Sequence, residues 1–168
     1  MKKLWIIGTL AAVALLASLT TVAFSDEEGR GALKAGLNGY QEVPSVSTIG
    51  SGSFQGQLSA DGTSIAYTLS YSDLEGATTF AAHIHLGQVG VAGGVSAFLC
   101  GGGNKPACPN TGGTVSGTIV ASDVIGPTGQ GIAAGELSEL INAIRAGVTY
   151  ANVHTDKHPG GEIRGHIK

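Results

Sequence analysis

Short stretches in which apolar and polar residues alternate recur along this chain, and they restrict its fold more than any other feature. In TSIAYTLSY, Ile65, Tyr67 and Leu69 share one face, because successive side chains of a strand point to opposite sides. The other stretches are ALKAGL, GSGSFQGQLS, ATTFAAHIHL, GGVSAFLC, GGTVSGTIV, GVTYANVHT and GEIRGHIK. Glycine, proline or an Asp-Gly turn bounds each stretch. The pattern therefore predicts about eight short strands.

One segment, GELSELINAIRAG, departs from this two-residue period. Its apolar residues recur at helical spacing, and they are Leu137, Leu140, Ile141 and Ile144. Gly147 is a suitable stop for such a helix. Short strands without alternating helices are typical of antiparallel sheets. We therefore expect an all-β fold, either a Greek-key sandwich or a flattened barrel, with one short amphipathic helix.

Residues 1–25 have the features of a secretory signal peptide. Lys2 and Lys3 precede an apolar run from Leu4 to Leu19, and small residues follow around Ala23. An uncleaved N-terminal anchor is the alternative, and a membrane would be a partner only in that case. Residues 26–168 then form one exported domain. We expect it to be secreted, periplasmic or on the exterior of the cell envelope.

Composition limits the partners of this domain. The whole chain has 28 glycines and a net charge of −3, and it shows no basic patch. Nucleic acid is therefore a poor partner. The high apolar content also argues against a disordered chain. An extracellular protein or a matrix component is the kind of partner that remains.

The two cysteines of the chain, Cys100 and Cys108, lie close together in CGGGNKPAC. In an exported protein, a pair with this spacing indicates a disulfide that closes a small loop.

Four of the five histidines fall in two motifs that suit a metal ion. His83 and His85 flank one isoleucine, so that on a strand both imidazoles point to the same side. The segment NVHTDKHPGGEIRG supplies His154 as a third ligand and His158 as a spare. Imidazoles in this arrangement suit copper or zinc. Glycines nearby predict that such a site is open to solvent.

Other residues of the second motif have supporting roles in this interpretation. Asp156 or Glu162 would orient an imidazole from behind the ligands. Arg164 pairs with the charged residues around Glu162, or attracts an anion to the metal site. His166 is interpreted as a surface residue. The alternative for the whole set is that the histidines make structural hydrogen bonds and bind no metal.

The order of the motifs resembles a known family. LNGYQEVPSV, HIHLG, YANVHT and HPGGEIRGHI are similar to the CHRD domain, from about Leu33 to Ile167. That domain occurs singly in many secreted microbial proteins. The resemblance implies an extracellular binding module, but it does not supply a biochemical role.

A fainter resemblance is to copper/zinc superoxide dismutase. Its H-x-H strand and later histidine correspond to His83, His85 and His154, which implies a copper site. The intervening loop LGQVGVAGG has no histidine or aspartate, so the zinc-binding loop of that family has no counterpart.

Three functions follow for comparison with the structure. The first is an exported CHRD-like binding module that holds copper, or alternatively zinc. The second is a degenerate dismutase-like metalloenzyme, and the third is a metal-free adhesion domain. Sequence alone favours a binding module over an enzyme.

Overall fold

The structure is a computed structural model, and it describes residues 31–168 of the chain. The expected signal peptide lies outside the described residues. The strands are β1 (Ala32–Asn38), β2 (Ser51–Leu58), β3 (Ser64–Ser72), β4 (Thr79–Leu86), β5 (Gly94–Cys100), β6 (Gly113–Val120), β7 (Thr149–Thr155) and β8 (Ile163–His166). The helices are α1 (Leu137–Arg145) and three short 3-10 turns, η1 (Gly39–Gln41), η2 (Ala121–Asp123) and η3 (Thr128–Gln130). All eight expected strands and the expected helix are present.

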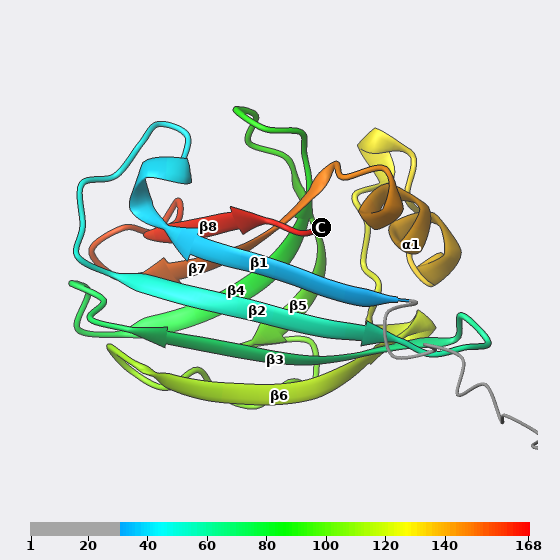
Figure 1. The fold of residues 1–168 in the computed structure, drawn as a ribbon, viewed down its shortest axis with the longest axis horizontal. Coiled ribbons are helices and arrows are strands. Elements are labelled where there is room, and N and C mark those ends of the chain that lie inside the picture. Colours follow the sequence, from blue (N-terminus) through cyan, green and yellow to red (C-terminus); the bar gives the residue numbers. More distant parts are fainter. Residues whose placement is uncertain (1–30) are drawn as a thin grey trace, which may run out of the picture.

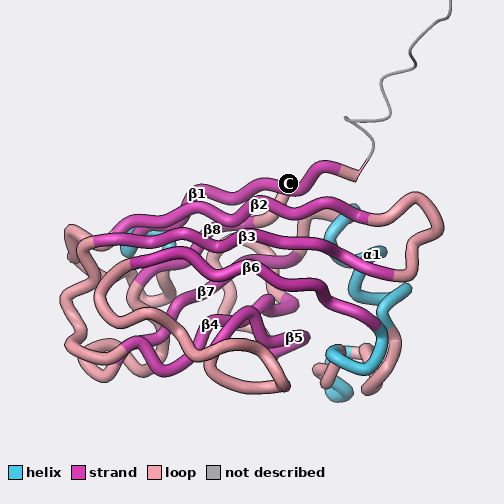
Figure 2. The backbone as a smooth tube through the Cα atoms, turned by 90° about the horizontal axis from the view of Figure 1, so that it is seen from below, coloured by secondary structure: helices cyan, strands magenta, loops and turns pink. Residues whose placement is uncertain are grey.

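The strands form a single antiparallel sheet in the order β5-β4-β7-β8-β1-β2-β3-β6. The sheet folds over on itself, so that β1, β2, β3 and β6 lie in one layer and β4, β5 and β7 in the other (Figure 2). Ala97 of β5 bridges Val124, just beyond β6, and thereby brings the two edges of the sheet together. The fold is therefore a nearly closed, flattened barrel, which confirms the all-β prediction.

The core lies between the two layers of the sheet. Phe54, Leu69, Ile84 and Leu99 come from different strands and are completely buried there. Full burial of such a side chain stabilises a fold by about 1.5–3 kcal/mol. The alternation expected from the sequence is thus the physical basis of the barrel.

Helix α1 covers one end of the barrel (Figure 1). Its buried residues are the four expected from the helical spacing: Leu137, Leu140, Ile141 and Ile144. Arg145 lies in the last turn, where a cation interacts favourably with the helix dipole. Across residues 31–168, the structure contains no helix with the length and apolar character needed to span a membrane.

One strand departs from simple alternation. In a regular strand Phe80 would share a face with Ile84, four residues later, but 46% of Phe80 is exposed and its ring lies 6.0 Å from that of His154. The cause is an irregularity of register between Thr79 and Ala81 in the pairing of β4 with β7. An extra residue in one strand moves the side chains on one side of it to the other face. Phe80 therefore belongs to the histidine side of β4.

Candidate metal centre

The two histidine motifs meet because β4 pairs with β7. His83 lies opposite Asn152 and His85 lies opposite Tyr150, while His154 lies opposite Ala81. Ile84 points into the core, so the neighbouring histidines project from the outer side of the sheet. The expected arrangement of His83 and His85 on one face is confirmed. Strand pairing has thus joined residues about seventy positions apart in sequence.

One nitrogen from each of His83, His85 and His154 lies within 4.8 Å of the others. The ring centroids are 5.4 Å apart for His83 and His85, 4.9 Å for His83 and His154, and 5.7 Å for His85 and His154. Among residues 31–168, no second set of three histidine, cysteine or acidic side chains lies so close together. We call these three residues the histidine triad.

Backbone carbonyls orient two rings of the triad. Nδ1 of His85 lies 3.0 Å from the carbonyl oxygen of Gly93, and Nδ1 of His154 lies 3.0 Å from that of Pro159. A carbonyl can only accept, so each Nδ1 carries the proton and each Nε2 keeps its lone pair. Both Nε2 atoms are buried and have no hydrogen-bond partner, and the same is true of Nδ1 of His83. These three nitrogens are the natural ligand atoms of the triad.

The triad is more buried than its glycine-rich surroundings suggested. The exposed fractions are 9% for His83, 6% for His85 and 7% for His154, which corrects the expectation of a site open to solvent. Burial, together with the nearby His154 and His85, lowers the pKa of His83 to about 3. Burial also lowers the pKa of His85 to about 4 and reduces that of His154. The imidazoles are therefore neutral, the form that binds metals.

Aromatic rings pack around the triad. Phe98 contacts His83 edge-on, with centroids 4.4 Å apart. Tyr150 stacks on His85 at 4.9 Å with nearly parallel planes. The hydroxyl of Tyr150 also accepts a hydrogen bond from the N–H of Gly93, at 3.0 Å. Tyr150 therefore fixes the His85 ring by stacking on it, and Gly93 fixes the same ring through its carbonyl oxygen.

Arg164 does not pair with the charged residues around Glu162. It is almost fully buried at 1% exposure, and its guanidinium lies 4.5 Å from the centre of the Tyr150 ring. Its Nε donates to the carbonyl of Gln41 and its Nη1 to that of Val91. No salt bridge of Arg164 occurs among the described residues, so the expected ion pair is not formed, whereas the attraction of an anion stays a prediction. Arg164 holds two loops against the outer face of the sheet, behind Tyr150.

Glu162 and Asp156 stabilise loops and do not orient imidazoles. Glu162 accepts hydrogen bonds from the hydroxyls of Thr48 and Thr155, and from the N–H groups of Glu75 and Gly76. Asp156 accepts from the N–H groups of Thr78 and Lys157. The role expected for both carboxylates is filled by the carbonyls of Gly93 and Pro159. These two carbonyls could not be predicted from the sequence, because every residue has a backbone carbonyl whatever its side chain.

The remaining histidines lie outside the triad. His158 was the spare ligand, but its backbone N–H bonds to Thr155 and its ring is not part of the close group. His166 was expected at the surface, but both of its ring nitrogens are buried, and its ring lies 5.6 Å from Tyr150. His166 is two residues after Arg164 on β8, so its side chain lies on the same outer face as the triad.

Three residues of this region were missed in the sequence. Tyr150 and Asn152 could have been found, because in TYANVHT they alternate with the core residues and share a face with His154. Glu42 lies in a loop and had no such signal. It is 5% exposed, and burial raises its pKa to about 7 although the charge of Arg164 opposes the shift. Glu42 and Asn152 both lie close to Gly161, because a Cβ atom on Gly161 would come within 2.7 Å of Glu42 Oε1 and of the Asn152 amide.

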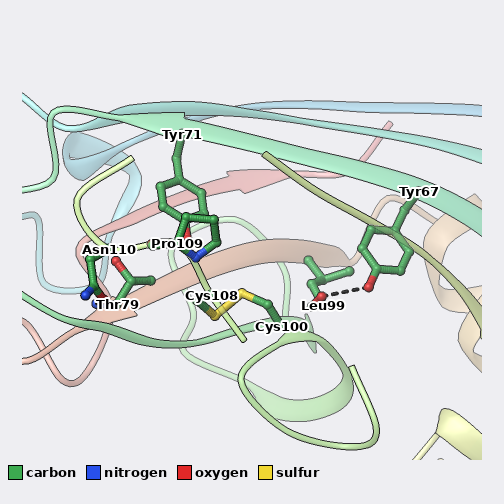
Figure 3. Close-up of a disulfide and its surroundings, with 8 residues drawn as sticks. All are labelled: Tyr67, Tyr71, Thr79, Leu99, Cys100, Cys108, Pro109 and Asn110. Carbon is green, nitrogen blue, oxygen red and sulfur yellow. Dashed lines mark hydrogen bonds between the residues drawn. A yellow bond between two sulfur atoms is a disulfide. The ribbon is translucent and has the colours of Figure 1, made fainter. Parts of the chain in front are cut away.

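The expected disulfide between Cys100 and Cys108 is present. Figure 3 shows it beside two tyrosines of β3. The hydroxyls of Tyr67 and Tyr71 donate to the carbonyls of Leu99 and Pro109, each at 2.6 Å. Burial raises the pKa of both tyrosines to about 12. The disulfide fits an oxidising compartment.

The donor set suits borderline metals. Three neutral imidazoles favour copper or zinc, whereas calcium and magnesium prefer oxygen ligands. Fold and site together define an all-β domain with a buried histidine triad on the outer face of its sheet.

The family model of the CHRD domain matches residues 33–167. The match covers nearly the whole chain, so the protein belongs to the CHRD domain family, as its motifs suggested. Comparisons with curated proteins and with solved structures found no match.

Proposed function

We propose that this CHRD domain is an exported binding module that holds one copper ion, or alternatively one zinc ion, through His83, His85 and His154. One observation carries the proposal. One nitrogen of each ring lies within 4.8 Å of a nitrogen of the other two, and each ring has a buried nitrogen without a hydrogen-bond partner. Leaving a buried polar atom unpaired costs about 1–3 kcal/mol, and a single cation would satisfy all three.

Metal binding requires the three ligand nitrogens to move slightly closer together. Metal–nitrogen bonds of about 2.0 Å place ligand nitrogens on the order of 3–4 Å apart. The rings of His85 and His154 are already oriented by Gly93 and Pro159, so rotation of His83 is the main adjustment. Divalent copper binds nitrogen sites more tightly than zinc does. We therefore expect copper to be the preferred ion.

Calorimetric titration of the metal-free chain from Asp26 onward tests the proposal. We expect one Cu(II) per chain, weaker Zn(II) binding, and no competition from Ca²⁺ or Mg²⁺. His85→Ala and His154→Ala should each abolish tight binding. His158→Ala and His166→Ala serve as matched controls and should retain it. Circular dichroism of every variant separates lost ligands from lost structure.

Two outcomes would reject the metal module. Equal copper binding by the triple alanine variant of the triad would place the metal elsewhere. No copper binding near neutral pH would leave a metal-free adhesion domain. The alternative of a dismutase-like enzyme has its own signature, which is copper-dependent consumption of superoxide that His85→Ala removes. Stabilisation by the metal without turnover supports the binding module.

A further inference from the structure

A cavity lies at the end of the barrel that α1 covers. It has a volume of about 810 Å³, and it is bounded by the start of β1, the end of β2 and the C-terminal half of α1. None of its lining residues belongs to the histidine triad or contacts it. We call this cavity the end cleft. Its size is within the range of about 300–1,000 Å³ that is typical of small-molecule sites.

The walls of the end cleft are aliphatic. Leu33 and Leu58 come from β1 and β2 and are only partly buried. Ile65 of β3 and Ile141 and Ile144 of α1 also line it. These five side chains carry no polar atoms, and no aromatic residue lines the cleft. Such walls fit a flexible alkyl chain better than a planar ring.

The charged side chains of the end cleft are both cations. Arg145 ends helix α1 and Lys168 follows β8, and both are exposed at the rim. No acidic residue lines the cleft. Within residues 31–168 neither cation takes part in a salt bridge. The protein as a whole is negatively charged, so a rim with only positive side chains is a local departure from its surface.

We propose that the end cleft binds an amphiphile with one alkyl chain and a carboxylate head, such as a free fatty acid. The alkyl chain lies between α1 and the β1–β2 pair, and the carboxylate lies at the rim beside Arg145 and Lys168. Apolar walls supply affinity through burial of methylene groups. The two cations fix the orientation of the ligand and select an anionic head over a neutral or cationic one.

Calorimetric titration with octanoate, decanoate and dodecanoate below their micelle concentrations tests this site. We expect one site per chain and a gain in affinity of up to about fourfold for each added methylene. Dodecyltrimethylammonium has the same tail with a cationic head and should bind far more weakly. Metal-free protein with all three triad histidines replaced by alanine should bind equally well. That variant excludes carboxylate binding at the triad and makes the result independent of the metal proposal.

Substitutions at the rim and the wall separate the two contributions. Arg145→Glu and Lys168→Glu should each weaken dodecanoate binding by about fivefold at low salt, and by less at high salt. Lys34→Glu is the matched control, because Lys34 pairs with Lys168 through the backbone but lies outside the cleft. Leu58→Glu places a carboxylate in the wall and should abolish binding. Circular dichroism confirms that each variant is folded.

Four results would overturn the proposal. The first is an affinity that does not depend on chain length, and the second is an equal affinity for the cationic amphiphile. The third is binding to vesicles of phosphatidylglycerol without binding to monomeric dodecanoate, which would indicate a membrane surface instead. The fourth is self-association in sedimentation experiments that Leu58→Glu disrupts and dodecanoate does not affect. That result would identify a second copy of the chain as the occupant.

Discussion

The ring of Phe98 lies edge-on against the ring of His83, with centroids 4.4 Å apart and planes inclined at 72°. Phe98 also supports the backbone of the disulfide loop, since a Cβ atom on Gly102 would come within 2.5 Å of the phenyl ring. The loop closed by Cys100 and Cys108 therefore packs on Phe98, and Phe98 packs on a ligand of the candidate metal site.

Replacement of Phe98 should loosen His83 without removing a ligand. We expect Phe98→Ala to reduce copper affinity by about tenfold, as observed for residues that orient metal ligands. Phe98→Leu keeps most of the apolar contact and should lose less. Calorimetric titration at neutral pH measures both variants. If copper binds equally well to Phe98→Ala and to the unchanged protein, the contact does not position His83.

Copper binding should persist at unusually low pH. An ordinary histidine has a pKa of about 6.5, and a site built from such residues would lose its metal near that pH. Burial lowers the pKa of His83 to about 3 and that of His85 to about 4. The neutral ligands therefore remain available at pH 5. We expect titration at pH 5 to give nearly the affinity found at pH 7, and a tenfold loss over this range would contradict the buried site.

The same buried histidines should make the metal-free fold sensitive to acid. Their folded pKa values lie below the ordinary value of about 6.5, so the unfolded chain takes up more protons. Their contribution to stability is complete above pH 6.5 and is lost as the pH falls toward 3–4. Urea denaturation between pH 4 and 7 measures this slope. The triple alanine variant of the triad should show a shallower slope, and an unchanged slope would assign it to other groups.

The contribution of Glu42 to the stability of the fold should depend on pH in the opposite direction. Burial raises its folded pKa from 4.5 to about 7, so its contribution is complete below pH 4.5 and is lost as the pH rises through 7. Glu42→Gln keeps the shape of the side chain and cannot ionise. We expect this variant to be more stable than the unchanged protein at pH 8 and similar to it at pH 5. Equal stability differences at both values would show that Glu42 is not protonated in the fold.

Glu162 should contribute strongly to stability. Burial alone would raise its pKa, but the hydrogen bonds from Glu75, Thr155, Thr48 and Gly76 outweigh that effect and lower it. Hydrogen bonds to a charged group contribute about 1.5–3 kcal/mol each. We expect Glu162→Gln to lower the free energy of unfolding by about 2–4 kcal/mol in urea denaturation. The exposed Glu139→Gln is the control, and a similar small effect for both would refute this role.

The two faces of β4 should respond differently to substitution. Ile84 is completely buried in the core, whereas His83 lies on the outer side of the strand. Ile84→Asp places a charge in the core and should prevent folding or lower the free energy of unfolding by more than 4 kcal/mol. His83→Asn should cost about 1 kcal/mol. Thermal unfolding compares the variants, and equal midpoints would show that the register of β4 is wrong.

Much of this domain follows from local sequence patterns. Alternation with a period of two located all eight strands, and the spacing of Leu137 and Ile144 located α1. The pattern His83-Ile84-His85 set the side of the strand from which the two imidazoles project. The spacing of Cys100 and Cys108 indicated their disulfide. These features depend on residues within a few positions of one another, where backbone geometry fixes which side chains share a face.

The surroundings of the triad were decided only by tertiary structure. The irregularity near Thr79 moved Phe80 to the histidine side, and packing of distant loops buried Arg164 beside Tyr150. The carbonyls of Gly93 and Pro159 orient the ligands. The identity of a residue does not predict that its backbone carbonyl lies in such a position. Burial, and with it the low pKa of His83, depends on segments far apart in the chain. Local patterns cannot encode such contacts, because they arise only when the strands pair and the loops close over them.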